Sequence, residues 1–272
     1  MRTARVNGVS LHYLDRGKGE PIVFVHGGLG DYGELGDVAS ALLPRYRVIT
    51  YSRRYDSPNA NPLRPGYSAR VDAEDLAGLI RELRLGPVHL VGASYGAYTS
   101  LLVALDHPEL VRSLTLAEPP LVGWLQRDPA GRAALSDFDR RFWKPMRTAA
   151  LAGDDERLLR VTVAFFSGEG EARRMPPELH DILLRNVAEF HALAKSSDPF
   201  PPIAAARVAR LRMPVLFMTG ERTYAGAKAI DGQLTRTLPT ARRVVVPGAD
   251  HNMCTEKAAA CAAAIATFLG RQ

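Results

Sequence analysis

The 272-residue sequence contains few cysteines, few lysines and no long apolar run, and each shortage excludes a class of protein. Its two cysteines, Cys254 and Cys261, lie in one predicted helix, where seven residues separate their Cα atoms by roughly 10 Å, too far for a disulfide. No apolar segment approaches the ~20 residues that a membrane span needs, and the first residues lack a secretory signal. We therefore expect a soluble, cytoplasmic protein.

Lysine occurs only five times among 35 basic residues, and the net charge of +6 comes from scattered arginines. Nucleic-acid-binding surfaces usually carry basic clusters interleaved with aromatic residues, so we expect no nucleic-acid partner. No group of cysteines, histidines and carboxylates has the spacing of a structural zinc site, and no full dinucleotide or phosphate-loop motif is present. We therefore expect neither a metal nor a cofactor. The 46% of hydrophobic residues is typical of a globular protein with a sizeable core.

Short apolar segments alternate with stretches of helical periodicity along most of the chain. Strands are predicted at Val9–Leu14, Pro21–His26, Arg47–Tyr51, Val88–Ala93, Val111–Ala117, Pro214–Thr219 and Arg242–Pro247. Helices are predicted at Glu34–Leu43, Ser68–Leu83, Tyr95–Leu105, Ala227–Leu238 and Asn252–Leu269. Several strands are apolar at every position, which indicates that both faces of the sheet are covered. The alternation favours an α/β fold with a mostly parallel, doubly wound sheet.

The alternation stops after Pro120 and resumes near residue 210, which divides the chain into a core of residues 1–120 and 210–272 and an insertion of residues 121–209. A structureless loop of this length is uncommon, so the insertion should be helical. It is either a packed subdomain or a lid with an apolar inner face, and its position at the strand ends favours the lid. Its large rings are Trp124, Phe138, Phe142, Trp143, Phe165, Phe166, Phe190 and Phe200.

The strongest chemical signal is the sequence Gly-Ala-Ser-Tyr-Gly at residues 92–96, between a predicted strand and a predicted helix. A sharp turn in this setting exposes a serine hydroxyl, and the flanking glycines permit the strained backbone and the close packing of helix on strand. We therefore predict that Ser94 is a nucleophile.

A serine nucleophile needs a base that takes its proton, and His251 is the histidine best placed for that role. It follows the last predicted strand and precedes the last helix. Serine first and histidine last is the order found in proteins with this kind of serine turn. The other histidines lie in predicted strands, after a helix or in the insertion, where structural roles suffice.

These features together resemble the α/β-hydrolase superfamily, and the resemblance covers nearly the whole chain. It implies that the insertion is a cap between strands six and seven. The segment from His26 to Gly28, after an apolar strand, resembles the family's oxyanion-hole motif. By this resemblance, the backbone amides of Gly28 and Tyr95 would stabilise the anion of a tetrahedral intermediate.

The third member of the expected triad departs from the commonest family pattern, because Thr223 stands where an aspartate is often found. Glu118 follows the preceding strand, at a carboxyl end where active-site groups gather, and some dehalogenases and lactonases of the superfamily carry their acid there. We therefore assign the acid to Glu118. The remaining alternatives are Glu221, Asp231, Asp250, or no acid at all.

The sequence thus predicts a hydrolase that cleaves an apolar carboxylic ester or lactone with a triad of Ser94, His251 and Glu118. C–C bond hydrolases, cofactor-free lyases or oxygenases, and ligand-binding receptors remain alternatives, because one scaffold hosts several chemistries. The segment Tyr51–Tyr55 either lines the mouth of the pocket or forms an exposed loop. The sequence predicts no oligomeric state.

Overall fold

The computed structural model describes residues 1–127 and 129–270, and its centre is a single eight-stranded sheet. The strands follow the spatial order β1-β2-β4-β3-β5-β6-β7-β8, and all pairs from β4 to β8 are parallel. The mostly parallel sheet is therefore confirmed. The strands are β1 (Arg2–Val6), β2 (Val9–Arg16), β3 (Pro21–Val25), β4 (Arg47–Tyr51), β5 (Val88–Ala93), β6 (Val111–Ala117), β7 (Val215–Gly220) and β8 (Arg242–Val246).

The first strand, β1, was not expected from the sequence. It pairs antiparallel with β2 at the edge of the sheet, with Arg2 opposite Tyr13 and Val6 opposite Val9. Only two of its five residues, Ala4 and Val6, are buried. Such a short, half-polar segment carries little signal of its own, and pairing with its neighbour decides its conformation.

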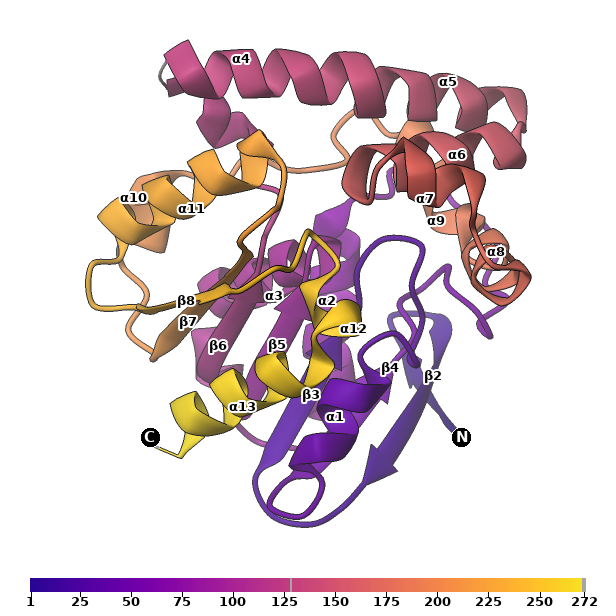
Figure 1. Ribbon diagram of the computed structural model, residues 1–272. Helices are drawn as coiled ribbons and strands as arrows, with labels where there is room; N and C mark the ends of the chain where they lie inside the picture. The colour runs from indigo at the N-terminus through magenta and orange to yellow at the C-terminus, as the bar shows by residue number, and fades with distance from the viewer. Residues whose placement is uncertain (128, 271–272) are drawn as a thin grey trace.

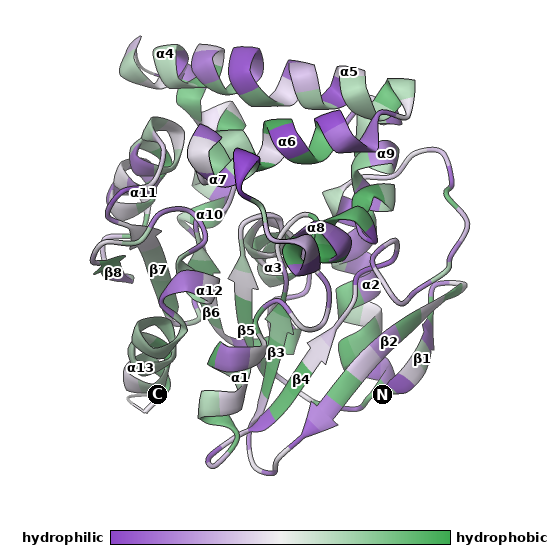
Figure 2. Ribbon diagram, turned by 45° about the vertical axis from the view of Figure 1, so that its right-hand side comes forward, coloured by the Kyte–Doolittle hydropathy of each residue, from purple (hydrophilic) through white to green (hydrophobic). Residues whose placement is uncertain are grey.

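Helices cover both faces of the sheet, as the apolar strands predict (Figure 1). One face packs against α1 (Gly36–Leu42) and α13 (Ala258–Leu269), and Ile22, Leu216 and Phe268 belong to its core. The opposite face packs against α2 (Ala69–Glu82), α3 (Tyr95–Asp106) and α11 (Ala225–Thr237). Figure 2 shows that the central strands are largely hydrophobic, whereas the helices alternate between hydrophobic and hydrophilic residues.

The chain between β6 and β7, which we call the cap, forms helices above the carboxyl ends of the strands (Figure 1). Phe138, Phe142, Met146 and Leu158 form part of a separate apolar cluster inside it. The elements are η2 (Val122–Arg127), α4 (Pro129–Phe138), η3 (Asp139–Trp143), α5 (Lys144–Ala152), α6 (Asp155–Phe166), α7 (Glu169–Arg173), α8 (Pro177–Leu184), α9 (Val187–Lys195) and α10 (Ala205–Val208).

The last predicted helix is wrong as a single element. The structure divides it into α12 (Met253–Glu256) and α13, because Lys257 leaves the helical region with φ −126° and ψ 42°. The argument that one straight helix separates the two cysteines is therefore wrong as well. Cys254 and Cys261 are free and buried, and the Cys261 thiol donates a hydrogen bond to the backbone carbonyl oxygen of Met253 at 3.3 Å.

Candidate active site

Ser94 lies at the sharp turn between β5 and α3, with backbone angles of φ +49° and ψ −118°. Few non-glycine residues adopt a positive φ, and such strain is concentrated at functional sites. A Cβ atom on Gly92 would lie 2.5 Å from the carbonyl oxygen of Gly96, and one on Gly96 would lie 2.2 Å from that of Val25. Both glycines are therefore required for the turn to pack against the sheet.

His251 follows β8 and lies between Ser94 and Glu118, which are 24 residues apart in the sequence. Its Nε2 is 2.9 Å from the Oγ of Ser94, and its Nδ1 is 2.5 Å from Oε2 of Glu118. Since a carboxylate only accepts hydrogen bonds, Nδ1 carries the proton and Nε2 is left to accept from the serine hydroxyl. The three side chains predicted from the sequence thus form one continuous hydrogen-bonded chain.

Glu118 is 5% exposed and has a positive φ of +48° directly after β6. Its Oε1 accepts a hydrogen bond from the backbone N–H of Gly220 at 2.8 Å, and its Oε2 accepts one from the Thr223 hydroxyl at 2.8 Å. Thr223, at the position where relatives often carry an aspartate, therefore binds the carboxylate that follows the preceding strand. Sequence reasoning missed this role of Thr223. The signal that could have revealed it was the presence of a threonine, a hydrogen-bond donor, at that position.

The three alternative acids have partners other than His251. Glu221 accepts a hydrogen bond from the backbone N–H of Gly248 at 2.7 Å. Asp231 pairs with Arg243, with its Oδ2 2.7 Å from Nε, and Asp250 accepts from the backbone N–H of Asn252 at 2.7 Å.

Residues 27–30, which we call the glycine loop, follow β3 and lie beside the serine turn. A Cβ atom on Gly27 would lie 3.5 Å from the Cβ of Ser94, so the loop contacts the nucleophile candidate directly. A Cβ atom on Gly28 would lie 2.9 Å from Cε2 of Phe190, a residue of the cap helix α9. Tyr95 begins α3, where backbone N–H groups have no partner within the helix.

Aromatic rings from the cap and from the loop after β7 cover His251. The ring of Phe166 stacks on the imidazole with a centroid distance of 4.5 Å and an interplanar angle of 23°. Tyr224 meets the same imidazole edge-on at 5.6 Å, and Phe165 packs on both rings at 5.0 and 5.3 Å. The predicted apolar surroundings therefore exist, but Tyr224, which precedes α11, was not among the residues expected.

Comparison with known proteins decides the family. A sequence model of the alpha/beta hydrolase fold matches residues 20–258. The chain belongs to the α/β-hydrolase family. Among curated relatives, 2-(acetamidomethylene)succinate hydrolase of Mesorhizobium japonicum is 26% identical to this α/β hydrolase, over 92% of this chain and 88% of that protein. The uncharacterized hydrolase YraK of Bacillus subtilis is 36% identical over 44% of this chain, and the alignment spans only 45% of that relative.

Solved structures share the fold of this α/β hydrolase over almost its whole length. The enol-lactonase of Burkholderia xenovorans superimposes with a TM-score of 0.81 at 20% identity, covering 99% of this chain and 100% of that one. A thermophilic esterase of Thermogutta terrifontis gives a TM-score of 0.77 at 21% identity, covering 100% and 99% of the two chains.

The segment Tyr51–Tyr55 does not form an exposed loop. Every residue from 51 to 56 is buried, and the side chain of Arg53 is among the largest that are fully buried. The Arg53 guanidinium lies over the ring of Tyr95, with its carbon 4.4 Å from the ring centroid. Sequence reasoning missed this arginine, because a basic residue after a strand is usually exposed.

Several groups near the glycine loop have strongly shifted pKa values. Burial, followed by the positive charge of Arg53, holds the pKa of His26 well below its usual value, so His26 is neutral and its Nε2 accepts from the Arg53 backbone N–H at 3.0 Å. Burial raises the pKa of Glu34 to about 7, and the carboxyl oxygen Oε2 of this residue accepts from the Gly27 backbone N–H at 3.0 Å.

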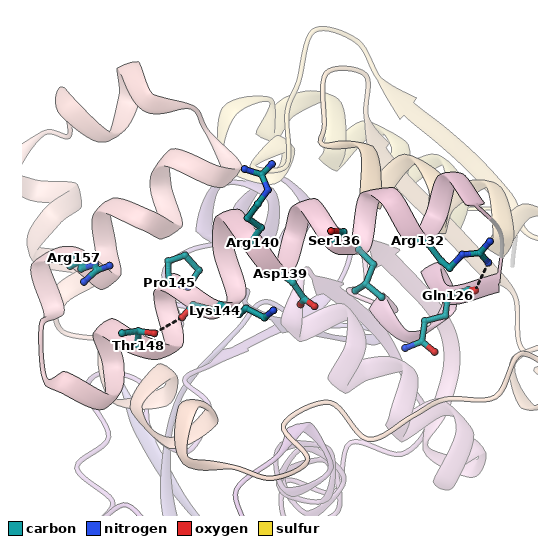
Figure 3. A pocket seen from close by; sticks show the side chains of 10 residues that line it. Gln126, Arg132, Ser136, Asp139, Arg140, Lys144, Pro145, Thr148 and Arg157 are labelled. Atoms are coloured by element: carbon teal, nitrogen blue, oxygen red, sulfur yellow. Dashed lines mark hydrogen bonds between the residues drawn. The ribbon is translucent and has the colours of Figure 1, made fainter.

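A hollow of about 790 Å³ runs along α4, η3 and α5 (Figure 3). Its lining includes four cationic side chains, Arg132, Arg140, Lys144 and Arg157, and no residue of the serine turn or the glycine loop. It is therefore separate from the candidate site.

Within residues 1–127 and 129–270, no helix combines the length and apolarity required to cross a bilayer. In the same residues, no cluster of three or more His, Cys, Asp or Glu side chains is arranged to hold a metal ion. A cytoplasmic location stays a prediction.

Proposed function

We propose that this α/β hydrolase cleaves carboxylic ester or lactone bonds of apolar small molecules through an acyl-enzyme on Ser94. The observation that carries the proposal is the hydrogen-bonded chain from Ser94 through His251 to Glu118, covered by aromatic rings. A serine hydroxyl is a poor nucleophile until an adjacent base removes its proton.

Acylation begins when Oγ of Ser94 attacks the substrate carbonyl carbon while Nε2 of His251 takes the hydroxyl proton. The carbonyl electron pair moves to oxygen, and the backbone amides of Gly28 and Tyr95 stabilise the resulting anion. When the carbonyl re-forms, the bond to the alcohol breaks, and the departing oxygen takes the proton from His251. Glu118 orients the imidazole and stabilises its cationic form.

Deacylation repeats these steps with water as the nucleophile. His251 takes a proton from the water, whose oxygen attacks the acyl carbon. The second tetrahedral intermediate then expels Oγ of Ser94, which recovers its proton from His251. The products are a carboxylic acid and an alcohol, or a hydroxy acid from a lactone, and neither step needs a cofactor.

The rings around His251 support a substrate whose acyl group is uncharged. Phe166 and Tyr224 pack against the imidazole, and Phe190 packs against Gly28. An unpaired carboxylate buried among such rings would cost several kcal/mol. The Mesorhizobium japonicum relative is named for a succinate, whose charges such a surface would not match. We therefore assign this chain to neutral esters or lactones.

Two p-nitrophenyl esters with six-carbon acyl groups test this assignment, the neutral hexanoate and the mono-adipate with its terminal carboxylate. The wild type should hydrolyse the hexanoate with at least about tenfold higher kcat/KM. Equal rates, or faster adipate hydrolysis, would contradict the neutral acyl group and leave the chemistry of Ser94 standing.

Ser94→Ala tests the chemistry itself with the hexanoate ester. We expect kcat to fall by roughly 10⁴–10⁶, because loss of the nucleophile removes the acyl-enzyme route. Retained turnover in this variant would refute the proposed function.

A further inference from the structure

Arg53 makes a direct contact with the peptide group that carries the proposed oxyanion donor. Its Nη2 donates a hydrogen bond to the carbonyl oxygen of Gly27 at 2.8 Å, and its side chain is fully buried. Burying a guanidinium is costly unless its charge is paired and its N–H groups donate hydrogen bonds. The groups around Arg53 therefore hold its guanidinium in one place.

The carbonyl of Gly27 and the N–H of Gly28 belong to the same planar peptide unit. In a trans peptide the two groups point in opposite directions, so a partner that fixes the carbonyl also fixes the N–H. A cation on the carbonyl oxygen also polarises the peptide, and linked hydrogen bonds strengthen one another in this way. Arg53 therefore orients the Gly28 N–H and strengthens it as a donor.

The cap supplies the carboxyl group that holds Arg53 most closely. Glu189, on α9, is completely buried, and its Oε1 lies 2.6 Å from Nη1 of Arg53. Its Oε2 accepts a hydrogen bond from Nη2 of Arg53 at 2.9 Å, and its Oε1 accepts one from the Tyr67 hydroxyl at 3.1 Å. Its carboxyl group also lies close to the glycine loop: it interacts electrostatically with the backbone N–H of Leu29, and a Cβ atom on Gly28 would lie 3.9 Å from its Oε2.

Leu29 has a positive φ of +61°, which an ordinary side chain rarely adopts without support from its surroundings. The contact with Glu189 supplies such support on one side of Gly28, while Arg53 fixes the peptide on the other side. Phe190, the next residue of α9, packs on Gly28 itself. One turn of a cap helix thus contacts Gly28 and Leu29, and through Glu189 it also holds Arg53, which binds the carbonyl of Gly27.

Charge neutralisation alone does not explain Glu189. The core already places two buried carboxyl groups near Arg53, with Asp56 at 3.5 Å and Asp72 at 4.0 Å. A third carboxyl group in the same buried space adds repulsion, and burial raises the pKa of Glu189 as well as that of both aspartates. What distinguishes Glu189 is its additional contact with the glycine loop.

We infer that Arg53 and Glu189 are positioning residues for the Gly28 amide, so that the cap helix α9 completes the oxyanion hole. This inference rests on the proposed function. It assigns the cap a role in transition-state stabilisation, besides its role in enclosing the substrate.

The variant Glu189→Gln tests the inference, because it keeps the side-chain volume and removes the charge. With p-nitrophenyl hexanoate we expect kcat to fall about 10–100-fold and KM to change less than about threefold, since loss of a whole oxyanion donor costs roughly 10²–10³. The affinity for hexylboronic acid, which forms a tetrahedral adduct on Ser94, should weaken by the same factor as kcat/KM.

Asp75→Asn is the matched control. Asp75 is a buried carboxylate that binds Arg54 through two hydrogen bonds of 2.8 and 2.9 Å, in an ion pair that does not contact the glycine loop. Both variants should lower the thermal unfolding temperature, but in Asp75→Asn kcat and boronate affinity should stay within about threefold of the wild type. If Glu189→Gln does not fold, Glu189→Asp gives the same test, with a smaller expected decrease in kcat and in boronate affinity.

Two results would overturn the inference while the proposed function stands: unchanged kcat and boronate affinity in Glu189→Gln, or an equal loss in Asp75→Asn. An increase in KM alone would also overturn it, because that pattern indicates a role in substrate binding only. If the wild type neither hydrolyses the ester nor binds the boronate, the proposed function fails and the inference fails with it.

Discussion

The two halves of the candidate site are held by different parts of the molecule. Ser94, Glu118 and His251 follow core strands β5, β6 and β8 and bind one another, and the partners of Glu118 also come from the core. The glycine loop follows core strand β3, but Glu189 and Phe190 of the cap contact it.

Because the triad is held by the core and the glycine loop is also held by the cap, different properties of the site depend on the position of the cap. The hydrogen bonds from Ser94 through His251 to Glu118 join core residues only, so we expect that geometry to depend less on the cap. The proposed oxyanion donor at Gly28 and the ring of Phe166 over His251 depend on the cap being in place. Substitutions in the core triad should therefore have the largest effects on kcat. Those in the cap should have smaller effects, on kcat where they loosen the glycine loop and on KM where they remove apolar surface from the proposed pocket.

Glu118→Gln should show the largest effect of the substitutions that probe this comparison. An amide in place of the carboxylate no longer fixes the Nδ1 proton or stabilises the imidazolium, so kcat should fall by about 10³–10⁴ with little change in KM. Steady-state kinetics with p-nitrophenyl hexanoate measures this. Glu221→Gln is the control, and its kcat should stay within about threefold of the wild type. A large loss in Glu221→Gln with little loss in Glu118→Gln would instead assign the triad acid to the loop after β7.

Phe166→Ala should have a moderate effect from the cap side. The variant removes the ring stacked on His251 and apolar surface from the proposed pocket, and we expect kcat/KM for the hexanoate to fall about tenfold, mostly through KM. The acetate ester should be affected less. Leu179→Ala, at an exposed residue of the cap helix α8, is the control. An equal loss with both esters would argue against a role in acyl-chain binding.

Much of this comparison could be predicted from the sequence, but only on the core side. The Gly-Ala-Ser-Tyr-Gly turn and the placement of His251 are local signals, and Glu118 was found because active-site groups gather where parallel strands end. The contact of Arg53 with Glu189 joins residues 136 positions apart and has no local pattern. Cap contacts depend on how helices pack against the core, which periodicity alone does not specify.

Two features of the fold were missed for a similar reason. Strand β1 depends on pairing with β2, and the break at Lys257 depends on how α12 and α13 pack. Local propensity favours one continuous Ala-rich helix there, and tertiary packing overrides it. Neither error affected the predicted site, because no site residue lies on β1 and His251 precedes α12.

The smallest predicted effect concerns Glu34, which holds the glycine loop from the core side. Burial raises the pKa of this carboxyl group from about 4.5 to about 7, although Arg53 and His251 act to lower it. Between these pH values the folded protein keeps a proton that the unfolded chain has lost, so this group makes the free energy of unfolding fall as the pH rises.

Glu34→Gln removes that titration. The free energy of unfolding of the variant, relative to the wild type, should therefore increase from pH 4.5 to pH 7 and level off above it. Urea unfolding of both proteins at four pH values across this range measures the difference. A difference that stays constant with pH would show that Glu34 titrates normally.

The rate at which a fluorophosphonate labels the protein tests most directly whether His251 activates Ser94. In this reaction Oγ of Ser94 forms a bond to phosphorus and fluoride leaves, so mass spectrometry of peptides locates the adduct. We predict one phosphonyl group per wild-type chain, on Ser94, and labelling that is at least about 10³-fold slower in His251→Ala. An adduct on another residue, or equally fast labelling of both proteins, would contradict the account.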